Sequence, residues 1–351
     1  SSQAVLLELI AAHDVTAVYW NRLYEPALVK RDKKIKKALS DSGIEAKSFK
    51  SHLLFEPFEV ATGKDEPYRV FTPFWKKCRG QLETASPAAT ARIDSAGMEI
   101  ASDALDALNL LPNLSWHEKL QSYWQPGEAG AHANLERFIN QSLQDYSEAR
   151  DVPSRNGTSR LSAHLHFGEI SPRQVVWAVM TAEDIPHAQR EKYLAELGWR
   201  EFAHHLLFHY PHTLDQPFNE KFTDYPWVSH KDSSDLQAWQ HGATGIDLVD
   251  AGMRELWETG IMHNRVRMVV GSLLTKNLGI HWLQGARWFW DTLVDADLAN
   301  NALGWQWIAG CGADAAPFFR IFNPQRQAER YDPAPDRAAR VPRACLPRRR
   351  S

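Results

Sequence analysis

Residues 189–209 read QREKYLAELGWREFAHHLLFH, and this stretch decides the fold class of the larger part of the chain. Apolar side chains recur in it at spacings of three and four residues, as Tyr193, Leu194 and Leu197 do. That period is typical of an amphipathic helix, and Pro211 ends the pattern. The sequence therefore predicts a long helix at this point.

The same period continues on both sides of this stretch. Further helices are predicted over residues 135–146, 171–182, 236–239, 246–259, 264–278 and 282–293. Asp, Ser or Gly separates these segments, as expected where helices begin and end. The chain shows no internal repeat. The pattern predicts an all-helical domain over residues 131–332.

The first 85 residues carry a different pattern. They predict helices at 4–12, 31–42 and 72–81 and strands at 15–20 and 46–49. Helices and strands alternate, which indicates a parallel α/β sheet. No strand precedes the first helix, so we expect a partial α/β domain over residues 1–85.

Two segments lack a regular pattern. Residues 86–115 are rich in Ala, Ser, Pro and Asp, and we predict an interdomain linker over residues 86–130. After Pro333 the chain consists largely of Arg, Pro and Ala with almost no apolar pattern. This composition predicts a disordered tail over residues 333–351.

The bulk composition is that of an ordinary globular protein. Of the 351 residues, 44% are hydrophobic and 24% are charged, and the net charge is −3. No apolar run reaches the roughly 18 residues that span a membrane, and no signal peptide opens the chain. We therefore expect a cytoplasmic protein with no membrane partner, most simply a monomer. Any affinity for DNA must come from a local basic patch.

The three cysteines do not form a recognisable site. Cys78, Cys311 and Cys345 lie far apart and give no CxxC pair, which fits a reducing compartment and argues against structural zinc. His205 and His209 with His212 have the spacing of metal ligands, but Pro211 should end the helix before His212. We therefore predict no metal site.

Residues 157–162, GTSRLS, place hydroxyl groups and backbone N–H groups in a short turn before a helix. Such a turn can bind a pyrophosphate, and it can equally be a plain capping turn. Residues 310–315, GCGADA, match GxGxxA, but the strand and helix that a dinucleotide fingerprint needs are not predicted around them. The chain contains no GxxxxGK[ST], GxSxG or HExxH motif.

Several longer motifs occur in a fixed order. They are YSEARDVPSRNGTSRLSAHLHFGEISPRQ at 146–174, ELGWREF at 196–202, the TG and VDAGMR segments between 244 and 254, MHNRVRM at 262–268, and DADLANN, GWQW and RIFNP between 295 and 324. In order and spacing they resemble the DNA photolyase and cryptochrome family, most of all the bacterial photolyases that act on cyclobutane pyrimidine dimers. The resemblance covers roughly residues 5–332.

This resemblance implies a fold and an activity. The fold is an N-terminal α/β, Rossmann-like antenna domain, here incomplete, followed by an all-helical FAD-binding domain. The activity is that of a deoxyribodipyrimidine photo-lyase, a carbon–carbon lyase. It repairs pyrimidine dimers in DNA by light-driven electron transfer from reduced FAD to a dimer flipped out of the duplex.

The resemblance also implies a cofactor site. The FAD-binding set is Tyr146, Arg150, Thr158, Ser159, Arg160, Leu161, Ser162, Asn264, Arg267, Asp295, Asp297 and Asn301. Within it the 158–162 turn contacts the diphosphate, and Arg267 and Asp295 form a buried ion pair beside the flavin ring. Asp297 accepts hydrogen bonds from ribityl or ring donors, and Asn301 faces the flavin N5.

The remaining implied residues serve the electron and the DNA. Trp305, Trp282 and Trp227 match the family's electron-transfer triad. The substrate and DNA set is Glu196, Trp199, Arg200, Asn264, Arg265, Met268, Trp307 and Arg320. In it, Trp199 and Trp307 wedge the dimer and Glu196 hydrogen-bonds its pyrimidine edge. The three arginines are candidates for phosphate contacts, and the alternative for them is ordinary surface charge.

Two other functions stay open. A cryptochrome would use the same fold for blue-light signalling without repair, but Asn301 stands where plant cryptochromes carry Asp. Glu196, Trp199, Met268 and Trp307 form the cyclobutane-dimer set. The other alternative is a flavin-bound DNA-binding protein without turnover.

The ends of the chain depart from the family pattern. Residues 21–26, NRLYEP, and Arg31-Asp32 resemble the second half of the antenna domain, and the motifs of its first half are absent. We therefore expect the chain to start inside that domain, which argues against a 5,10-methenyltetrahydrofolate or deazaflavin antenna without excluding one. The Arg/Pro stretch after residue 333 replaces an acidic–aromatic helix of the family and indicates a truncated or frame-shifted end.

Overall fold

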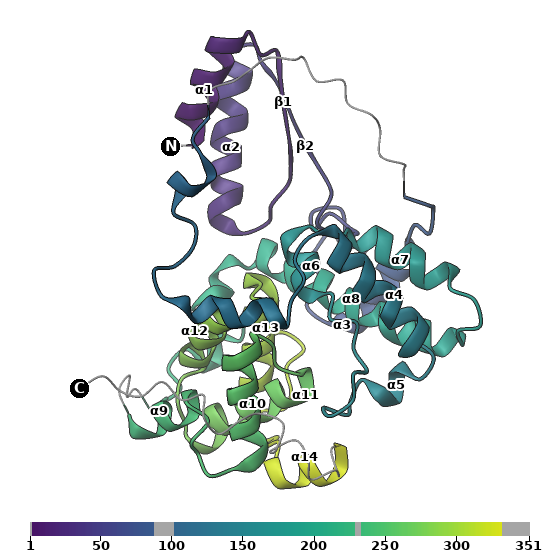
Figure 1. Ribbon diagram of the computed structural model, residues 1–351, viewed down its shortest axis with the longest axis vertical. Helices are drawn as coiled ribbons and strands as arrows, with labels where there is room; N and C mark the ends of the chain where they lie inside the picture. Colours follow the sequence, from purple (N-terminus) through teal and green to yellow (C-terminus); the bar gives the residue numbers. More distant parts are fainter. Residues whose placement is uncertain (1, 88–101, 229–232, 332–351) are drawn as a thin grey trace.

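The computed structural model describes residues 2–87, 102–228 and 233–331. A small α/β unit comes first, and a larger helical body follows it (Figure 1). The predicted tail over 333–351 lies outside the described residues. Among the described residues, no helix combines the length and apolar character that crossing a membrane requires.

The α/β unit consists of α1 (Ser2–His13), β1 (Ala17–Asn21), α2 (Pro26–Asp41) and β2 (Glu45–Phe49). The two strands pair in parallel, with β1 opposite β2 from end to end, so the predicted parallel arrangement is confirmed. Helix α2 begins five residues before the predicted start. Pro26 at its first position explains this, because the fixed φ of proline is suited to a helix N-terminus.

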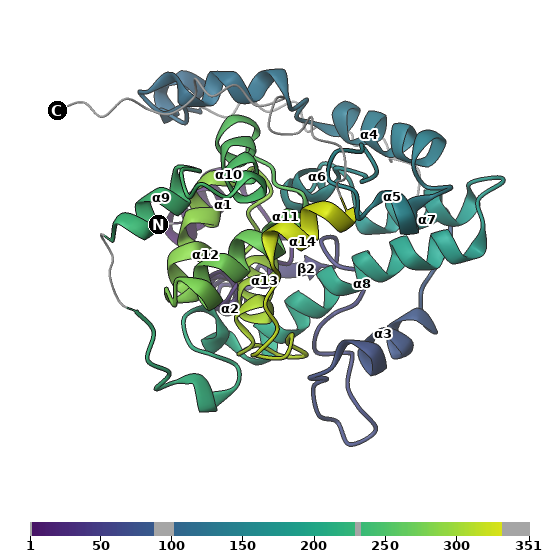
Figure 2. The same cartoon turned by 90° about the horizontal axis from the view of Figure 1, so that it is seen from below.

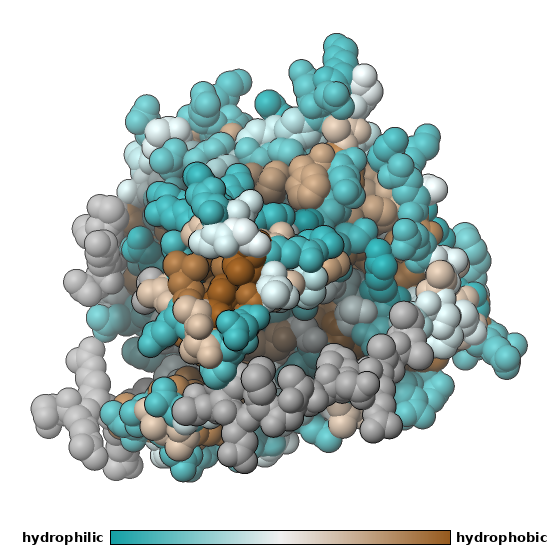
Figure 3. All heavy atoms as spheres, turned by 90° about the horizontal axis from the view of Figure 1, so that it is seen from above, coloured by the Kyte–Doolittle hydropathy of each residue, from teal (hydrophilic) through white to brown (hydrophobic). Residues whose placement is uncertain are grey.

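This unit buries few apolar side chains among the described residues. Helix α1 has no buried residue, and Val5, Tyr19 and Phe49 are each at least half exposed. Figure 3, which looks onto this end of the molecule, shows brown apolar side chains between the teal polar ones. The main hydrophobic core therefore lies in the helical body.

Helix α8 (His187–His209) is the centre of that body and confirms the long helix predicted over 189–209. Figure 2 shows it crossing the body between α3 (Phe71–Arg79) and the group formed by α4 (Glu128–Gln141), α5 (Tyr146–Ala149) and α7 (Pro172–Thr181). Helix α8 packs against α13 (Leu298–Ala309) on one side and α3 on another.

The other elements surround α8. They are η1 (Leu105–Leu108), η2 (Ser115–Ser122), α4 (Glu128–Gln141), α5 (Tyr146–Ala149), α6 (Ser162–Phe167), α7 (Pro172–Thr181), η3 (Pro211–Leu214), η4 (Glu220–Phe222), α9 (Ser234–Gln240), α10 (Asp247–Thr259), α11 (Asn264–Ser272), the π-helical η5 (Leu273–Asn277), α12 (Trp282–Thr292), α13 (Leu298–Ala309) and α14 (Pro324–Tyr331). One core cluster lies among α9 to α13, and a second lies among α4, α5, α7 and the first half of α8.

Two predicted helices differ in detail. The segment predicted as one helix over 135–146 is divided, because α4 ends at Gln141 and α5 begins at Tyr146. The segment over 264–278 is α11 continued by the π-helical turn. Helix α13 was not predicted by periodicity, since it is apolar on most of its surface and shows no clear polar face.

One face of α8 fixes the segment that leads from the α/β unit into the body. The Glu201 carboxylate accepts hydrogen bonds from the backbone N–H groups of Leu54 (2.9 Å) and Phe55 (3.1 Å). The His205 Nε2 atom accepts one from the N–H of Tyr68 at 3.0 Å, and His209 Nε2 lies 2.9 Å from a backbone carbonyl. These two histidines thus bind backbone groups, and α8 ends before Pro211 as predicted.

The buried His205 makes the stability sensitive to acid. Burial, with a smaller contribution from His209, lowers the pKa of His205 to about 4. The unfolded chain, with a pKa near 6.5, therefore binds more protons between pH 6.5 and 4, so the protein loses stability as the pH falls through this window.

We predict that His205→Gln, which keeps an acceptor for the Tyr68 N–H, loses about 2–3 kcal/mol less stability than the wild type between pH 7 and 4.5. Urea unfolding at the two pH values measures this difference. His132→Gln, at an exposed position of α4, is the matched control and should behave as the wild type. Equal acid sensitivity in His205→Gln and the wild type would contradict the assignment.

Candidate functional site

The 157–162 turn connects α5 to α6 and has a constrained backbone. Arg160 adopts a positive φ of 55°, and the Leu161 N–H points at the Ser159 hydroxyl. Gly157 lies against the backbone of Ala149, where a Cβ would come within 2.4 Å of the carbonyl oxygen. Only glycine fits this contact, so the turn is held in place against α5.

A partly buried guanidinium lies next to the turn. Arg137 of α4 donates from one nitrogen to the carbonyls of Thr158 (3.2 Å) and Ser159 (3.3 Å). Its other terminal nitrogen is buried and has no hydrogen-bond partner in the described part of the chain. Burial and the nearby charge of Arg160 lower the pKa of Arg137. Two cations beside a hydroxyl-rich turn suit an anion such as a diphosphate.

The predicted ion pair between Arg267 and Asp295 is present. One guanidinium nitrogen of Arg267 lies 3.0 and 2.9 Å from the two carboxylate oxygens of Asp295. Arg267 Nε also donates to the Met262 carbonyl at 2.7 Å. The Asp295 side chain is 6% exposed and that of Arg267 is 28% exposed, so the pair is open on the arginine side.

Asp297 is the N-cap of α13 and lies in a buried charge cluster. One carboxylate oxygen accepts from the Asn300 backbone N–H at 2.8 Å and from its side-chain amide at 2.6 Å. The other oxygen lies 3.4 Å from His204 Nε2 and 3.6 Å from His166 Nδ1. Burial acts to raise the pKa of Asp297, but His204, His166 and Arg200 outweigh it and hold that pKa well below its usual value.

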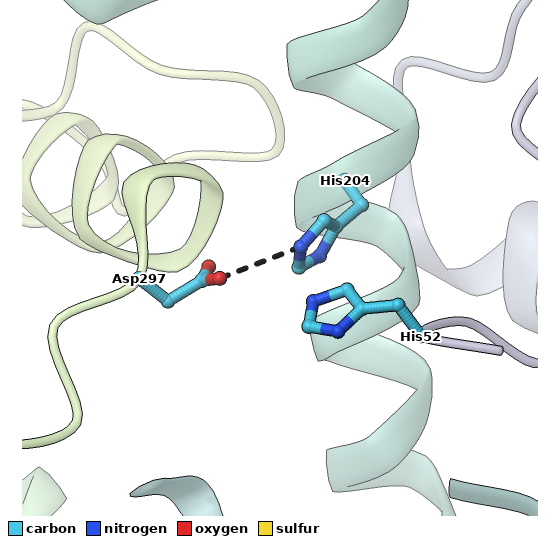
Figure 4. Close-up of side chains that lie close together, drawn as sticks. All are labelled: His52, His204 and Asp297. Atoms are coloured by element: carbon cyan, nitrogen blue, oxygen red, sulfur yellow. Dashed lines mark ion pairs between the residues drawn. The ribbon is translucent and has the colours of Figure 1, made fainter. Parts of the chain in front are cut away.

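His52 completes this cluster, as Figure 4 shows. Donor atoms of His52, His204 and Asp297 lie within 4.8 Å of one another, a spacing that a metal ion could use. Arg200 argues against a metal, because its guanidinium donates to His52 Nε2 at 2.9 Å and places a fixed positive charge there. Burial, and then Arg200, lowers the pKa of His52 to about 3, so this ring stays neutral.

Sequence reasoning missed His52, His166 and His204, because no motif or period connects residues so far apart. It assigned Arg200 to a DNA phosphate, whereas the structure gives this side chain internal partners. Arg200 also donates to the His52 carbonyl at 2.8 Å, and its side chain is only 11% exposed.

Asn301 follows one turn later on α13. Its side-chain amide donates from Nδ2 to the Ala286 carbonyl of α12 at 2.8 Å. Since a carbonyl can only accept, this bond fixes the amide orientation and leaves Oδ1 for another donor.

Two of the three predicted electron-transfer tryptophans are buried. Trp305 and Trp282 are 3% and 1% exposed, and Trp227 is only partly buried. His281 lies between Trp282 and Trp227, with ring centroids 5.6 and 5.4 Å away. Trp227 is thus the most exposed of the three rings, while their order along a path and the electron transfer itself stay predictions.

The substrate residues lie on several elements. Glu196 of α8 forms an ion pair with Arg150, whose guanidinium lies 5.5 Å from the Tyr146 ring. Trp199 stacks on Phe71 of α3 with centroids 3.8 Å apart. The Phe71 ring thus fixes the orientation of the Trp199 ring.

The other substrate and DNA residues occupy α11, the end of α13 and the loop after it. Trp307 packs at a tilt against Phe322, 6.1 Å away, and Arg320 is exposed above the same ring. Arg265 is bound to Asp151 at 2.7 Å. Asn264 is exposed and Met268 is partly buried on the same helix, whereas at the turn Ser162 is exposed and Leu161 is buried.

Comparisons with known proteins agree with this architecture. A family described as "DNA photolyase" matches residues 1–91, and one described as "FAD binding domain of DNA photolyase" matches residues 193–338. A deoxyribodipyrimidine photo-lyase of Agrobacterium fabrum is 43% identical over 94% of this chain and 69% of its own length. The chain belongs to the DNA photolyase family.

The chain is also similar to cryptochromes and to solved structures of the family. Cryptochrome-1 of Arabidopsis thaliana is 36% identical over 95% of the chain and 50% of its own length. The crystal structure of a class III photolyase from Agrobacterium tumefaciens has a TM-score of 0.93 at 43% identity, covering 97% of this chain and 71% of that one. A Synechocystis cryptochrome structure has a TM-score of 0.85 at 28% identity, covering 97% and 71%.

The contact between the Trp305 ring and Gly285 of α12 can be tested by substitution. A Cβ on Gly285 would lie 2.1 Å from the Trp305 ring, so Gly285→Ala should cost about 1–3 kcal/mol through overpacking. Thermal unfolding followed by tryptophan fluorescence measures the loss. Gly304→Ala on α13 is the control, since nothing lies near its Cβ and alanine favours a helix by about 0.5–1 kcal/mol. A stable Gly285→Ala variant would contradict this packing.

Proposed function

We propose that this chain is a deoxyribodipyrimidine photo-lyase that binds FAD and repairs cyclobutane pyrimidine dimers in DNA with light. The observation that carries the proposal is the arrangement on α13. Asp297, Asn301 and Trp305 follow one another along its inner side, next to the Arg267–Asp295 pair, in a chain 43% identical to a named photo-lyase.

The residues present fit FAD. The unpartnered nitrogen of Arg137, with Arg160, gives the diphosphate a positive environment beside the hydroxyls and N–H groups of the 158–162 turn. Asn301 Oδ1 offers an acceptor for a ring N–H. Tyr146, Arg150 and Asn264 remain members of the proposed binding set. Reduced FAD, when bound, supplies on illumination the electron that splits the dimer.

The residues of the chain act on the DNA by position and charge. Trp199 and Trp307 offer aromatic faces to the flipped dimer, which has already lost normal stacking and is therefore cheaper to extrude than sound bases. Glu196 accepts hydrogen bonds from the dimer while Arg150 holds its carboxylate in place. Asn264 and Met268 line the cavity that takes the flipped dimer, and Arg265 and Arg320 contact DNA phosphates.

The electron path in this proposal runs through Trp305, Trp282 and Trp227. Indole is readily oxidised, and the burial of the first two rings excludes water from the path. The antenna pigment is not part of the proposal, because the described residues identify no pigment.

A second candidate function is blue-light reception, supported by the 36% identity to an Arabidopsis cryptochrome. Asn301 and the Glu196, Trp199 and Trp307 set favour repair over reception. An illuminated dimer-containing oligonucleotide separates the two, since only a repair enzyme restores the intact pyrimidines.

We predict that Glu196→Ala and Trp307→Ala each lower light-dependent repair of such an oligonucleotide at least about tenfold while FAD binding changes less. Lost dimers measured by chromatography and the flavin absorption spectrum give the two readouts. Lys192→Ala, at an exposed position of α8, is the control and should repair normally. A wild-type protein with bound flavin and no repair would contradict the proposal.

We also predict that Arg137→Ala weakens FAD binding at least about tenfold, because a charge-assisted contact and the support of the turn are lost together. Titration of the purified protein with FAD measures the affinity. Arg173→Ala, which removes a partly exposed arginine of α7, is the matched control. Unchanged affinity in Arg137→Ala would show that the diphosphate lies elsewhere.

A further inference from the structure

The cluster around Asp297 contains a histidine, His204, whose contacts bear on its charge. His204 Nδ1 lies 3.0 Å from the carbonyl of Arg200, one turn back on α8, so this nitrogen must carry a proton. His204 Nε2 lies 3.4 Å from an Asp297 carboxylate oxygen that bonds no other described N–H group more closely. Because a carboxylate offers only acceptor lone pairs, the contact is attractive only when Nε2 is protonated too. Both nitrogens then carry protons, and the ring is a cation.

The surroundings of His204 favour this form. Its side chain is 4% exposed, and burial alone would favour the neutral ring. The Asp297 charge and hydrogen bond outweigh burial and the opposing charge of Arg200, so the pKa of His204 is raised. A raised pKa means that the proton is held at pH 6.5 and is lost only at a higher pH.

Other titratable groups near His204 are His52, Tyr24 and Glu201, with His166 beyond Asp297. His52, from the segment before α3, packs edge-on with ring centroids 5.3 Å apart, and it stays neutral. Tyr24 packs edge-on at 6.4 Å with its hydroxyl donating to Glu56. Glu201 is engaged with backbone N–H groups. On the far side of Asp297, His166 stands 3.6 Å away.

We propose that protonated His204 is a positioning residue for FAD, which keeps the buried Asp297 carboxylate ionised and aimed so that it can accept a hydrogen bond from the cofactor. This inference rests on the proposed FAD site and concerns a residue outside the set that the sequence motifs named. Without the imidazolium, the buried Asp297 carboxylate would lose the largest of the contributions that offset its burial and would more readily take up a proton or reorient. A protonated Asp297 is a poorer acceptor, so the cofactor would be held less tightly.

The test is a double-mutant cycle with FAD affinity as its readout. His204→Gln keeps a hydrogen-bonding side chain and removes the charge, and we expect it to weaken FAD binding at least about tenfold at pH 7. Asp297→Asn removes the charge that His204 compensates. In the Asp297→Asn background, the added His204→Gln change should alter affinity by less than about threefold, since the interaction is already gone. His209→Gln, on the same helix and turned toward Pro57, is the control.

A second measurement needs no cofactor. Nitrogen-15 NMR of the histidine rings in the purified protein at pH 7 should show both nitrogens of His204 protonated, and circular dichroism confirms that each variant is folded. Equal FAD affinity in the wild type and His204→Gln overturns the inference and leaves the proposed function standing. So does the same loss in both backgrounds, which is what a purely structural role predicts, and so does a neutral His204 ring. A folded wild type that takes up no FAD overturns the proposed function and the inference together.

Discussion

The burial of one carboxylate, Asp297, sets the geometry on which the rest of the site depends. Its two oxygens act in different directions, one capping α13 through Asn300 and the other facing His204 of α8. An ionised carboxylate at this depth is stable only with such partners. These contacts thereby fix the distance and rotation of α8 relative to α13. Helix α8 carries Glu196 and Trp199, and α13 carries Asn301 and Trp305.

Neighbouring positions on α8 give the same helix a second role. Glu201 and His205 bind backbone N–H groups of the 54–68 segment, which would otherwise be buried without partners. Through these bonds, α3 is seated so that Phe71 stacks on Trp199. Glu201 and His205 thus influence the orientation of the Trp199 ring indirectly, through the position of α3.

Local patterns in the sequence predicted much of this structure. The period of residues 189–209 predicted α8, and the family resemblance of the two motifs that carry Arg267 and Asp295 implied an ion pair that is present. The division between α4 and α5 was missed because the apolar period runs through it unbroken. The His52–His204–Asp297 cluster was out of reach, since it depends on three elements meeting in space and leaves no spacing in the chain.

The charged groups of the site separate into two kinds, and the difference bears on the proposed position of the cofactor. Arg267 and Arg150 each have a carboxylate partner in the protein, so their charges are already balanced. The buried nitrogen of Arg137 has no partner within the described chain, and Arg160 adds a like charge beside it. A buried donor without a partner costs free energy that folding must offset elsewhere. A bound anion would complete this arrangement, which supports the proposed position of the diphosphate at this turn, with the neutral part of the cofactor toward Asn301.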